Sequence, residues 1–173
     1  MNIDGYVACI CEGSAERAII GLLLENDRLI FNTKKLLDGE IIRCRNGKAF
    51  ESRYLRKGFK EKITIFRILD SRREKFRLSE TYIGKVDVIN VVTAPEIEML
   101  IILKEDKYKE FKKSGMKPSD FCQSILKYKN VKSYDFVKDY FADVNKLIEC
   151  IGEYKRISKV RSREYTLRDL IKV

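Results

Sequence analysis

The 173-residue chain contains no histidine and no tryptophan, and it has only two prolines and nine glycines. Without histidine there is no Ser-His-Asp or Cys-His relay, no imidazole general base and no zinc site built with imidazole. Acid–base chemistry near neutral pH is therefore left to carboxylates, Lys, Tyr, Cys or metal-bound water. The few prolines and glycines leave little room for a long flexible linker, which favours a single domain over residues 1–173.

Long apolar runs, a secretory signal and paired cysteines are also missing. The longest apolar runs, residues 18–24 and 99–103, are too short to span a bilayer. Residues 1–5 carry Asp4 and lack the basic segment of a secretory signal. The five cysteines are scattered and form no CxxC pair, so neither a zinc ribbon nor a thioredoxin-type site is supported. These features predict a cytoplasmic protein with reduced thiols and no membrane contact.

Positive charge is abundant but unevenly distributed along the chain. The sequence has 36 Lys and Arg against 26 Asp and Glu, which gives a net charge of +10 and a pI of about 9.3. Residues 32–86 carry a net charge of +9 and residues 151–173 a net charge of +4, whereas residues 1–31 carry −3. This concentration of positive charge predicts a polyanionic partner such as DNA or RNA.

Apolar and amphipathic patterns predict an α/β fold. Short apolar or alternating runs predict strands over residues 6–11, 28–31, 62–69 and 85–92, with a further candidate strand over 40–44. Ser14 is a candidate cap for the first helix, and helical patterns cover residues 14–26, 96–103, 118–128 and 133–151. Strands separated by helical segments indicate a mostly parallel sheet flanked by helices. We expect the core over about residues 5–103 and a helical C-terminal extension over 104–173.

Acidic residues follow three of the predicted strands. Glu12 comes directly after the first strand, Asp70 after residues 62–69, and Glu96 and Glu98 after residues 85–92. Because the carboxyl ends of parallel strands meet at one edge, we expect Glu12, Asp70 and one of Glu96 or Glu98 to converge. Such carboxylates repel one another unless a hard cation such as Mg²⁺ or Mn²⁺ lies between them. The simpler alternative is that each acid caps a turn or complements a helix dipole.

Three segments resemble the motifs of Toprim domains. The segment CEGSAERAIIGLLL, in which Glu12-Gly13-x-x-Glu16 leads into an apolar helix, resembles the first Toprim motif, nearest to OLD-type nucleases and RloB-like phage-defence proteins. The segment ILDSR at residues 68–72 stands where that fold has a hydrophobic strand and an Asp-x-Asp motif. The segment APEIEML at residues 94–100 is similar to the RloB-like pattern of Pro, two residues, Glu and an apolar run. The resemblance covers about residues 5–103 and implies a Toprim-like, Rossmann-like fold.

This resemblance implies a metal-dependent nuclease or phosphodiesterase that acts on nucleic acid, in the context of phage defence, with Mg²⁺ or Mn²⁺ as its cofactor. It assigns Glu12 as a metal ligand or general acid–base, Asp70 as a metal ligand, and Glu16 and Glu98 as supporting ligands. Arg72 stands where these domains have a second Asp, so we expect it near the substrate phosphate, with Glu74 or Glu98 replacing the missing ligand. One alternative is a non-catalytic module that binds nucleic acid or protein with an incomplete metal site; another is a nucleotide sensor or nucleotide-processing enzyme.

Basic residues of the middle segment are candidate phosphate contacts. Phe50, Tyr54 and Phe59 interleave with them and are expected to stack on unpaired bases, unless these aromatics belong to the core and the charges form a solvated face. The predicted nucleic-acid contacts are Arg43, Arg45, Lys48, Arg53, Arg56, Lys57, Arg72, Arg73 and Arg77, extended by the C-terminal Lys155, Arg156, Lys159, Arg161 and Arg163. The sequence leaves open the choice between DNA and RNA, the oligomeric state and a protein partner in a defence complex.

Overall fold

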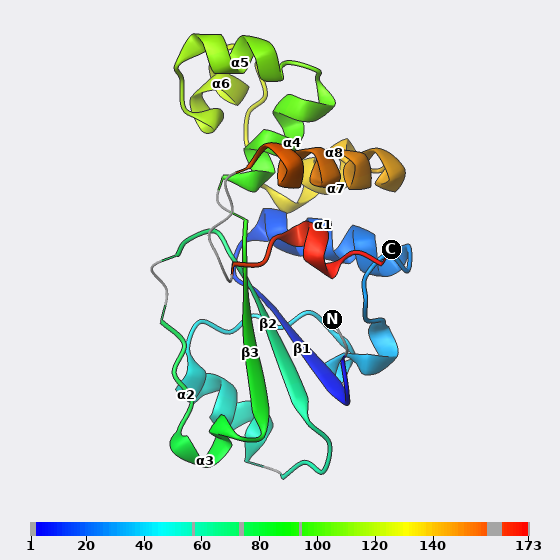
Figure 1. Cartoon of the computed structure of the whole chain (residues 1–173), viewed down its shortest axis with the longest axis vertical. Coiled ribbons are helices and arrows are strands. Elements are labelled where there is room, and N and C mark those ends of the chain that lie inside the picture. Colours follow the sequence, from blue (N-terminus) through cyan, green and yellow to red (C-terminus); the bar gives the residue numbers. More distant parts are fainter. Residues whose placement is uncertain (1–2, 57, 73–74, 94, 159–163, 173) are drawn as a thin grey trace.

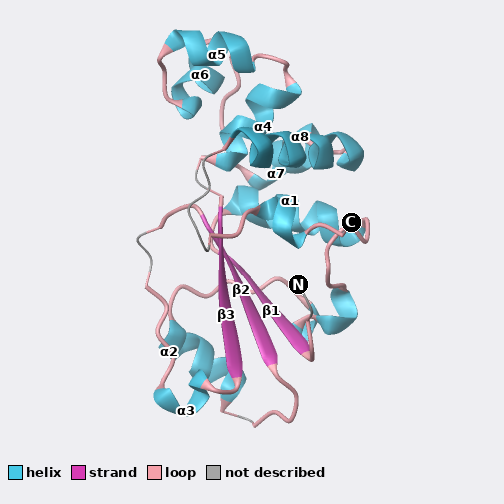
Figure 2. Ribbon diagram, viewed as in Figure 1, coloured by secondary structure: helices cyan, strands magenta, loops and turns pink. Residues whose placement is uncertain are grey.

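A sheet of three parallel strands forms the centre of the structure (Figures 1 and 2). The computed structural model describes residues 3–56, 58–72, 75–93, 95–158 and 164–172. The strands are β1 (Tyr6–Cys11), β2 (Ile63–Leu69) and β3 (Val86–Val92), in the order β1-β2-β3. In their register Cys9 pairs with Phe66, which pairs with Ile89. The prediction of a parallel sheet flanked by helices is confirmed.

Most of the helical residues form a layer beyond the carboxyl ends of the strands (Figure 1). In this layer α1 contacts α7, α4 contacts α8 and α6, and α5 and α6 lie farthest from the sheet (Figure 1). The helices of this layer are α1 (Ser14–Glu25), α4 (Glu96–Lys104), α5 (Tyr108–Ser114), α6 (Pro118–Ser124), α7 (Tyr134–Tyr140) and α8 (Val144–Ile157). The remaining short elements are α2 (Gly47–Phe50), continued by the π-helical turn η3 (Glu51–Leu55), α3 (Glu80–Ile83), and the 3₁₀ turns η1 (Thr33–Lys35), η2 (Leu37–Gly39) and η4 (Leu167–Leu170).

The two faces of the sheet pack against different hydrophobic clusters. Cys9 and Phe66 point to the face that packs with α1, α4 and the C-terminal helices. Ala8 and Ile65, one residue earlier on each strand, point to the opposite face and pack with residues of α2 and η3. All seven residues of β2 are buried, as expected for the central strand of a parallel sheet covered on both faces.

Two predicted strands form only isolated bridges in the structure. In residues 28–31, Leu29 makes one antiparallel bridge with Ile171. In residues 40–44, Ile42 makes one parallel bridge with Ile10 beside β1. Both predictions of a regular strand are therefore wrong, and of the two segments only residues 40–44 pair with a strand of the sheet.

The predicted long helices are shorter than their apolar patterns. The helix expected over 118–128 ends at Ser124, and the helix expected over 133–151 is divided into α7 and α8. The division arises at Asp143, whose carboxylate accepts hydrogen bonds from the backbone N–H groups of Asn145 and Lys146 and so begins a new helix. Gly13, and not Ser14, is the N-cap residue of α1.

Disulfides do not contribute to this fold. All five cysteines are free thiols, and burial raises the pKa of the Cys122 thiol to about 12. Within the residues that the structure describes, each helix is too short or too polar to cross a membrane.

Gly5 permits the close approach of β1 to β2, and Gly5→Ala is expected to destabilise the protein. Gly5 has a φ of +82°, and a Cβ atom there would lie 2.2 Å from the backbone oxygen of Lys62. The left-handed backbone and the forced separation of the strands together are expected to cost about 3 kcal/mol of unfolding free energy. Gly39 has a φ of +72° with open space around it, so Gly39→Ala should lose only about 1 kcal/mol. Urea unfolding of both variants measures the difference, and equal losses would contradict the steric argument.

Candidate functional site

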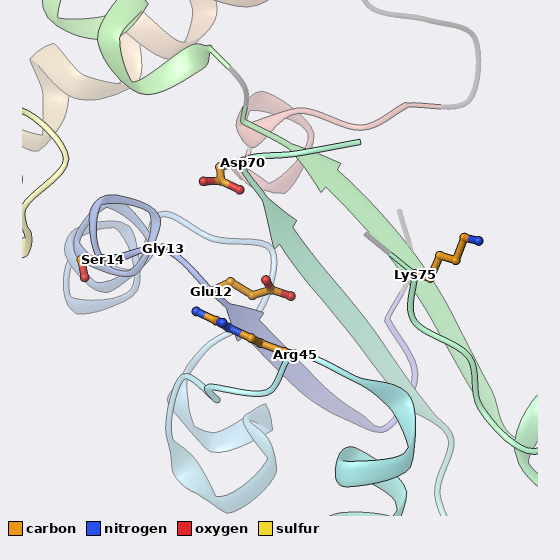
Figure 3. A pocket seen from close by; sticks show the side chains of 6 residues that line it. All are labelled: Glu12, Gly13, Ser14, Arg45, Asp70 and Lys75. Atoms are coloured by element: carbon orange, nitrogen blue, oxygen red, sulfur yellow. The ribbon is translucent and has the colours of Figure 1, made fainter. Parts of the chain in front are cut away.

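Glu12 and Asp70 meet in a pocket at the carboxyl ends of β1 and β2. Glu12 directly follows β1 and Asp70 directly follows β2, so the parallel pairing of these strands brings both acids to one edge of the sheet. Figure 3 shows them emerging from neighbouring strands at the border of a cavity of about 640 Å³. The residues that line it are Glu12, Gly13, Ser14, Arg45, Asp70 and Lys75. The structure thus places Glu12 and Asp70 at the same edge of the sheet, where both line one cavity.

Arg67 lies beneath this pocket and compensates the charge of Glu12. Its side chain is 2 % exposed, and its Nη2 atom lies 3.6 Å from Oε1 of Glu12. Nη1 of Arg67 donates a hydrogen bond to Oδ1 of Asn90 at 3.3 Å, and the guanidinium carbon lies 4.7 Å from the centre of the Phe76 ring. Arg67 was not among the residues predicted from the sequence; the available signal was an arginine within a mostly apolar strand, which requires a buried partner.

Glu16 is buried next to the pocket and does not line it. Its Oε1 lies 3.2 Å from Oγ1 of Thr93, which also lies 3.0 Å from the backbone oxygen of Leu69. A Cβ atom at Gly13 would lie 1.8 Å from Oε2 of Glu16, so the glycine provides the space in which this carboxylate lies. Burial raises the pKa of Glu16, and the nearby charge of Asp70 raises it further. Glu16 thus connects α1 to the ends of β2 and β3. It was predicted to be a supporting metal ligand, but its side chain does not line the pocket.

The acids that follow β3 point away from Glu12 and Asp70. Glu98 lines a separate cavity and has its Oε1 atom 3.2 Å from Nζ of Lys132. Glu96 is completely buried, and burial raises its pKa to about 8, while the backbone of Leu167 and the charge of Lys155 offset part of this effect. The expectation that one of them joins Glu12 and Asp70 is wrong, because α4 begins almost immediately after β3 and turns both side chains toward other helices.

Arg72 forms an ion pair on the surface instead of lining the pocket. Its Nε and Nη2 atoms donate hydrogen bonds to the two carboxylate oxygens of Glu164, at 2.8 and 3.1 Å. These hydrogen bonds raise the pKa of Arg72. The predicted place of Arg72 near a substrate phosphate is therefore not supported by its contacts. Glu74, the other candidate replacement ligand, lies outside the described residues.

Four basic residues cluster beside the carboxylates. Arg45 and Lys75 line the carboxylate pocket, and Lys75 also borders an adjoining cavity of about 360 Å³ with Lys48 and Arg77. We call Arg45, Lys48, Lys75 and Arg77 the basic rim. Arg45, Lys48 and Arg77 were among the predicted contacts, whereas Lys75 was missed although it belongs to the same basic segment of the sequence.

The other predicted nucleic-acid contacts lie outside both cavities or outside the described residues. Arg43, Arg53 and Arg56 are exposed, with Arg53 over the ring of Tyr54. Phe50 is completely buried, and Tyr54 and Phe59 pack against the same core cluster, so the expected stacking of Phe50 on bases is wrong. In the C-terminal run, Lys155 pairs with Asp169 and Arg156 with Glu153. Outside the described residues lie Lys57, Arg73, Lys159, Arg161 and Arg163.

Two carboxylates are available for a metal ion in the pocket. Over the described ranges, no group of three or more His, Cys, Asp or Glu side chains is arranged to hold a metal. Glu12 and Asp70 would supply two protein ligands, and Mg²⁺ sites with one or two carboxylates complete their coordination with waters and substrate phosphates.

Searches against protein-family models, curated proteins and solved structures find no match to this chain.

Proposed function

We propose that this protein is a Toprim-like, metal-dependent nuclease or phosphodiesterase whose active site is the pocket between Glu12 and Asp70. The observation that carries the proposal is the pair of carboxylates at adjacent strand ends, bordered by Arg45 and Lys75 in one cavity. Acidic ligands beside basic side chains suit a phosphodiester, which needs a divalent cation and further positive charge around its oxygens. The resemblance of residues 5–103 to Toprim domains supports the same chemistry.

Glu12 and Asp70 would hold Mg²⁺ or Mn²⁺ in this function. When bound, such an ion withdraws charge from the phosphate and makes a bound water nucleophilic near neutral pH. The basic rim would contact neighbouring phosphates and hold the strand across the pocket. Arg67 keeps Glu12 in position from below, through the contact of 3.6 Å between their side chains. Because metal-bound water would be the nucleophile, this chemistry does not require a histidine, which the chain lacks.

A second function, nucleic-acid binding without cleavage, is favoured by one specific observation. Arg67 already supplies a positive charge to Glu12, and no third acid lines the described part of the pocket. A carboxylate neutralised by a buried arginine has less need of a metal ion. In that case the basic rim would bind the backbone of a strand, while Glu12 and Asp70 would serve only the fold.

Cleavage assays with matched variants separate the two functions. Labelled single-stranded DNA, duplex DNA and RNA are incubated with the protein in Mg²⁺, Mn²⁺ or EDTA. For a nuclease we expect metal-dependent cleavage that falls at least about a hundredfold in Glu12→Gln and in Asp70→Asn, since each removes a ligand of the catalytic ion. Glu149→Gln is the control, because Glu149 is an exposed residue of α8 paired with Lys146.

Binding in EDTA tests the basic rim independently of cleavage. The double variant Arg45→Gln/Lys75→Gln is expected to weaken binding about tenfold or more and to reduce its salt dependence. The matched control is Lys112→Gln/Lys113→Gln, two exposed lysines of α5. Salt-sensitive binding without cleavage in either metal would overturn the nuclease and support the binding module. A protein that neither binds nor cleaves at low salt would overturn both.

A further inference from the structure

A second cavity, of about 380 Å³, lies between α4, α6 and the loop before α7. Glu98 reaches it from the first turn of α4, Ser119 and Gln123 from α6, and the loop contributes the residues from Tyr128 to Lys132. The volume is within the usual range of small-ligand sites. Its lining differs from that of the carboxylate pocket, because amide, hydroxyl and aromatic groups surround a single carboxylate.

The carboxylate of Glu98 is the distinctive feature of this cavity. Its side chain is only 5 % exposed, yet its partner is Lys132, whose side chain is 57 % exposed. A buried carboxylate needs compensation, and here the compensation comes from a flexible side chain at the surface. A ligand with suitable donors can therefore replace Lys132 at Glu98 without breaking the core. Since an ionised carboxylate only accepts hydrogen bonds, that ligand must present N–H or O–H groups to it.

Tyr128 supplies a rigid aromatic wall. Its hydroxyl donates a hydrogen bond to Oε1 of Glu105 at 2.8 Å, and its ring contacts Phe136 and Tyr140 with centroids 5.6 and 5.4 Å away. A ring held at its hydroxyl and packed against two others loses little conformational entropy when a ligand contacts it. Lys129 and Lys132 add positive charge at the same cavity, which suits a ligand that also carries phosphate.

We propose that the cavity around Glu98 binds a guanine base, with the Glu98 carboxylate accepting hydrogen bonds from the N1–H and N2–H groups of the base. Guanine offers two adjacent donors on its Watson–Crick edge, which match the two oxygens of a carboxylate. Adenine and cytosine place a ring acceptor beside their amino donor, and that acceptor is repelled by the second oxygen. Uracil and thymine have a single N–H donor between two acceptors. The carboxylate therefore selects guanine among the common bases.

The cavity around Glu98 and the carboxylate pocket share no lining residue. Glu16 is influenced by charges from both, since the charge of Asp70 raises its pKa and the charge of Lys132 lowers it. A guanine can come from a free nucleotide or from an unpaired position in a strand. Binding of the base does not depend on the proposed nuclease function.

Nucleotide binding in EDTA tests the cavity without any cleavage. Titration calorimetry or a competition assay compares guanosine, inosine and adenosine monophosphates on the full chain. The guanine nucleotide is expected to bind about tenfold or more tightly than the adenine nucleotide, with the inosine nucleotide, which lacks the N2 amino group, in between. Glu98→Gln is expected to abolish this preference, because an amide presents one donor and one acceptor. Lys132→Gln should keep the ratio, since the carboxylate remains, and Glu110→Gln on α5 is the surface control.

The source of the guanine is identified with an oligothymidylate that carries one guanine and with its all-thymine counterpart. Tighter binding of the guanine-containing strand than of the all-thymine strand assigns the cavity to nucleic acid. Equal binding of the two strands, together with binding of the guanine nucleotide, assigns it to a free nucleotide. Equal binding of the guanine and adenine nucleotides, no binding of either, or an unchanged ratio in a folded Glu98→Gln would overturn the proposal. Because EDTA is present throughout, loss of the nuclease function would not produce any of these outcomes.

Discussion

A Glu96→Gln variant is expected to be more stable than the natural chain at about pH 9 and about equally stable near pH 5. Glu96 is completely buried at the start of α4, and its carboxylate interacts with the backbone of Leu167 and with the charge of Lys155. Burial raises its pKa from 4.5 to about 8, so the folded protein holds a proton that the unfolded chain releases at lower pH. Glutamine has nearly the same shape as glutamate, and its side-chain amide does not ionise in this pH range.

The sign of this effect follows from the proton count in the two states. Between about pH 4.5 and about pH 8 the folded state binds more protons than the unfolded state, so the unfolding free energy of the natural chain falls as the pH rises. The difference in pKa corresponds to at most about 5 kcal/mol, all of it lost by the time the pH exceeds the folded pKa. Lys155, Tyr154 and Asp169 are the charged or titratable groups that interact with Glu96.

Urea unfolding of the natural chain and of Glu96→Gln across this pH range measures the effect. The unfolding free energy of the variant should decline less steeply with pH, and the gap between the two proteins should widen up to about pH 8 and then stay constant. Glu149→Gln, which changes an exposed glutamate, should follow the natural chain. Parallel curves for the natural chain and Glu96→Gln would show that Glu96 is ionised in the folded protein.

The parts of the site that the sequence predicts correctly are those that depend on strand order alone. An acid that directly follows a strand must lie at the carboxyl end of that strand, and parallel pairing then brings Glu12 and Asp70 together. Likewise, the alternating pattern of residues 62–69 predicts a strand that ends at Asp70, and β2 does end at Leu69, directly before it. Local pattern and chain direction are sufficient for both conclusions.

The parts that the sequence does not predict depend on rotation about a helix or on distant partners. Glu98 is two residues from Glu96 on α4, and the packing of α4 against α6 and α8 leaves Glu96 completely buried while Glu98 lines a cavity. Arg72 pairs with Glu164, 92 residues later in the chain, and no local pattern announces such a partner. Phe50 alternates with basic residues in the sequence, but the short α2 turns its ring into the core.

Arg67→Met is expected to destabilise the folded protein more than any single change of a surface charge. It removes the cation beside Glu12, the hydrogen bond to Asn90 and the contact with the Phe76 ring, while roughly conserving side-chain volume. Loss of one partner from a buried ion pair costs about 3 to 5 kcal/mol, because the remaining charge stays poorly solvated. For a chain of this size that corresponds to a fall in Tm of about 10 °C.

Lys62→Met is the matched control for this loss. Lys62 and Asp87 form an ion pair of 2.7 Å at the opposite end of the sheet, but their side chains are 48 % and 53 % exposed. Exposed pairs of this kind contribute about 0 to 1 kcal/mol, so the same substitution there should change Tm little. Equal effects of the two substitutions would mean that Arg67 contributes no more than a surface lysine does.

A double-mutant cycle with Glu12→Gln connects this stability effect to the function of the pocket. If the charge of Glu12 is what Arg67 compensates, Glu12→Gln should restore about 1 to 3 kcal/mol of the stability lost in Arg67→Met, and additive losses would show that the two side chains do not interact. Mn²⁺ bound at Glu12 and Asp70 would offer the same compensation. We therefore expect Mn²⁺ to raise the Tm of Arg67→Met more than that of the natural chain, and not to raise that of the double variant. A metal response that is equal in all three proteins would place any bound ion elsewhere and argue for the binding module over the nuclease.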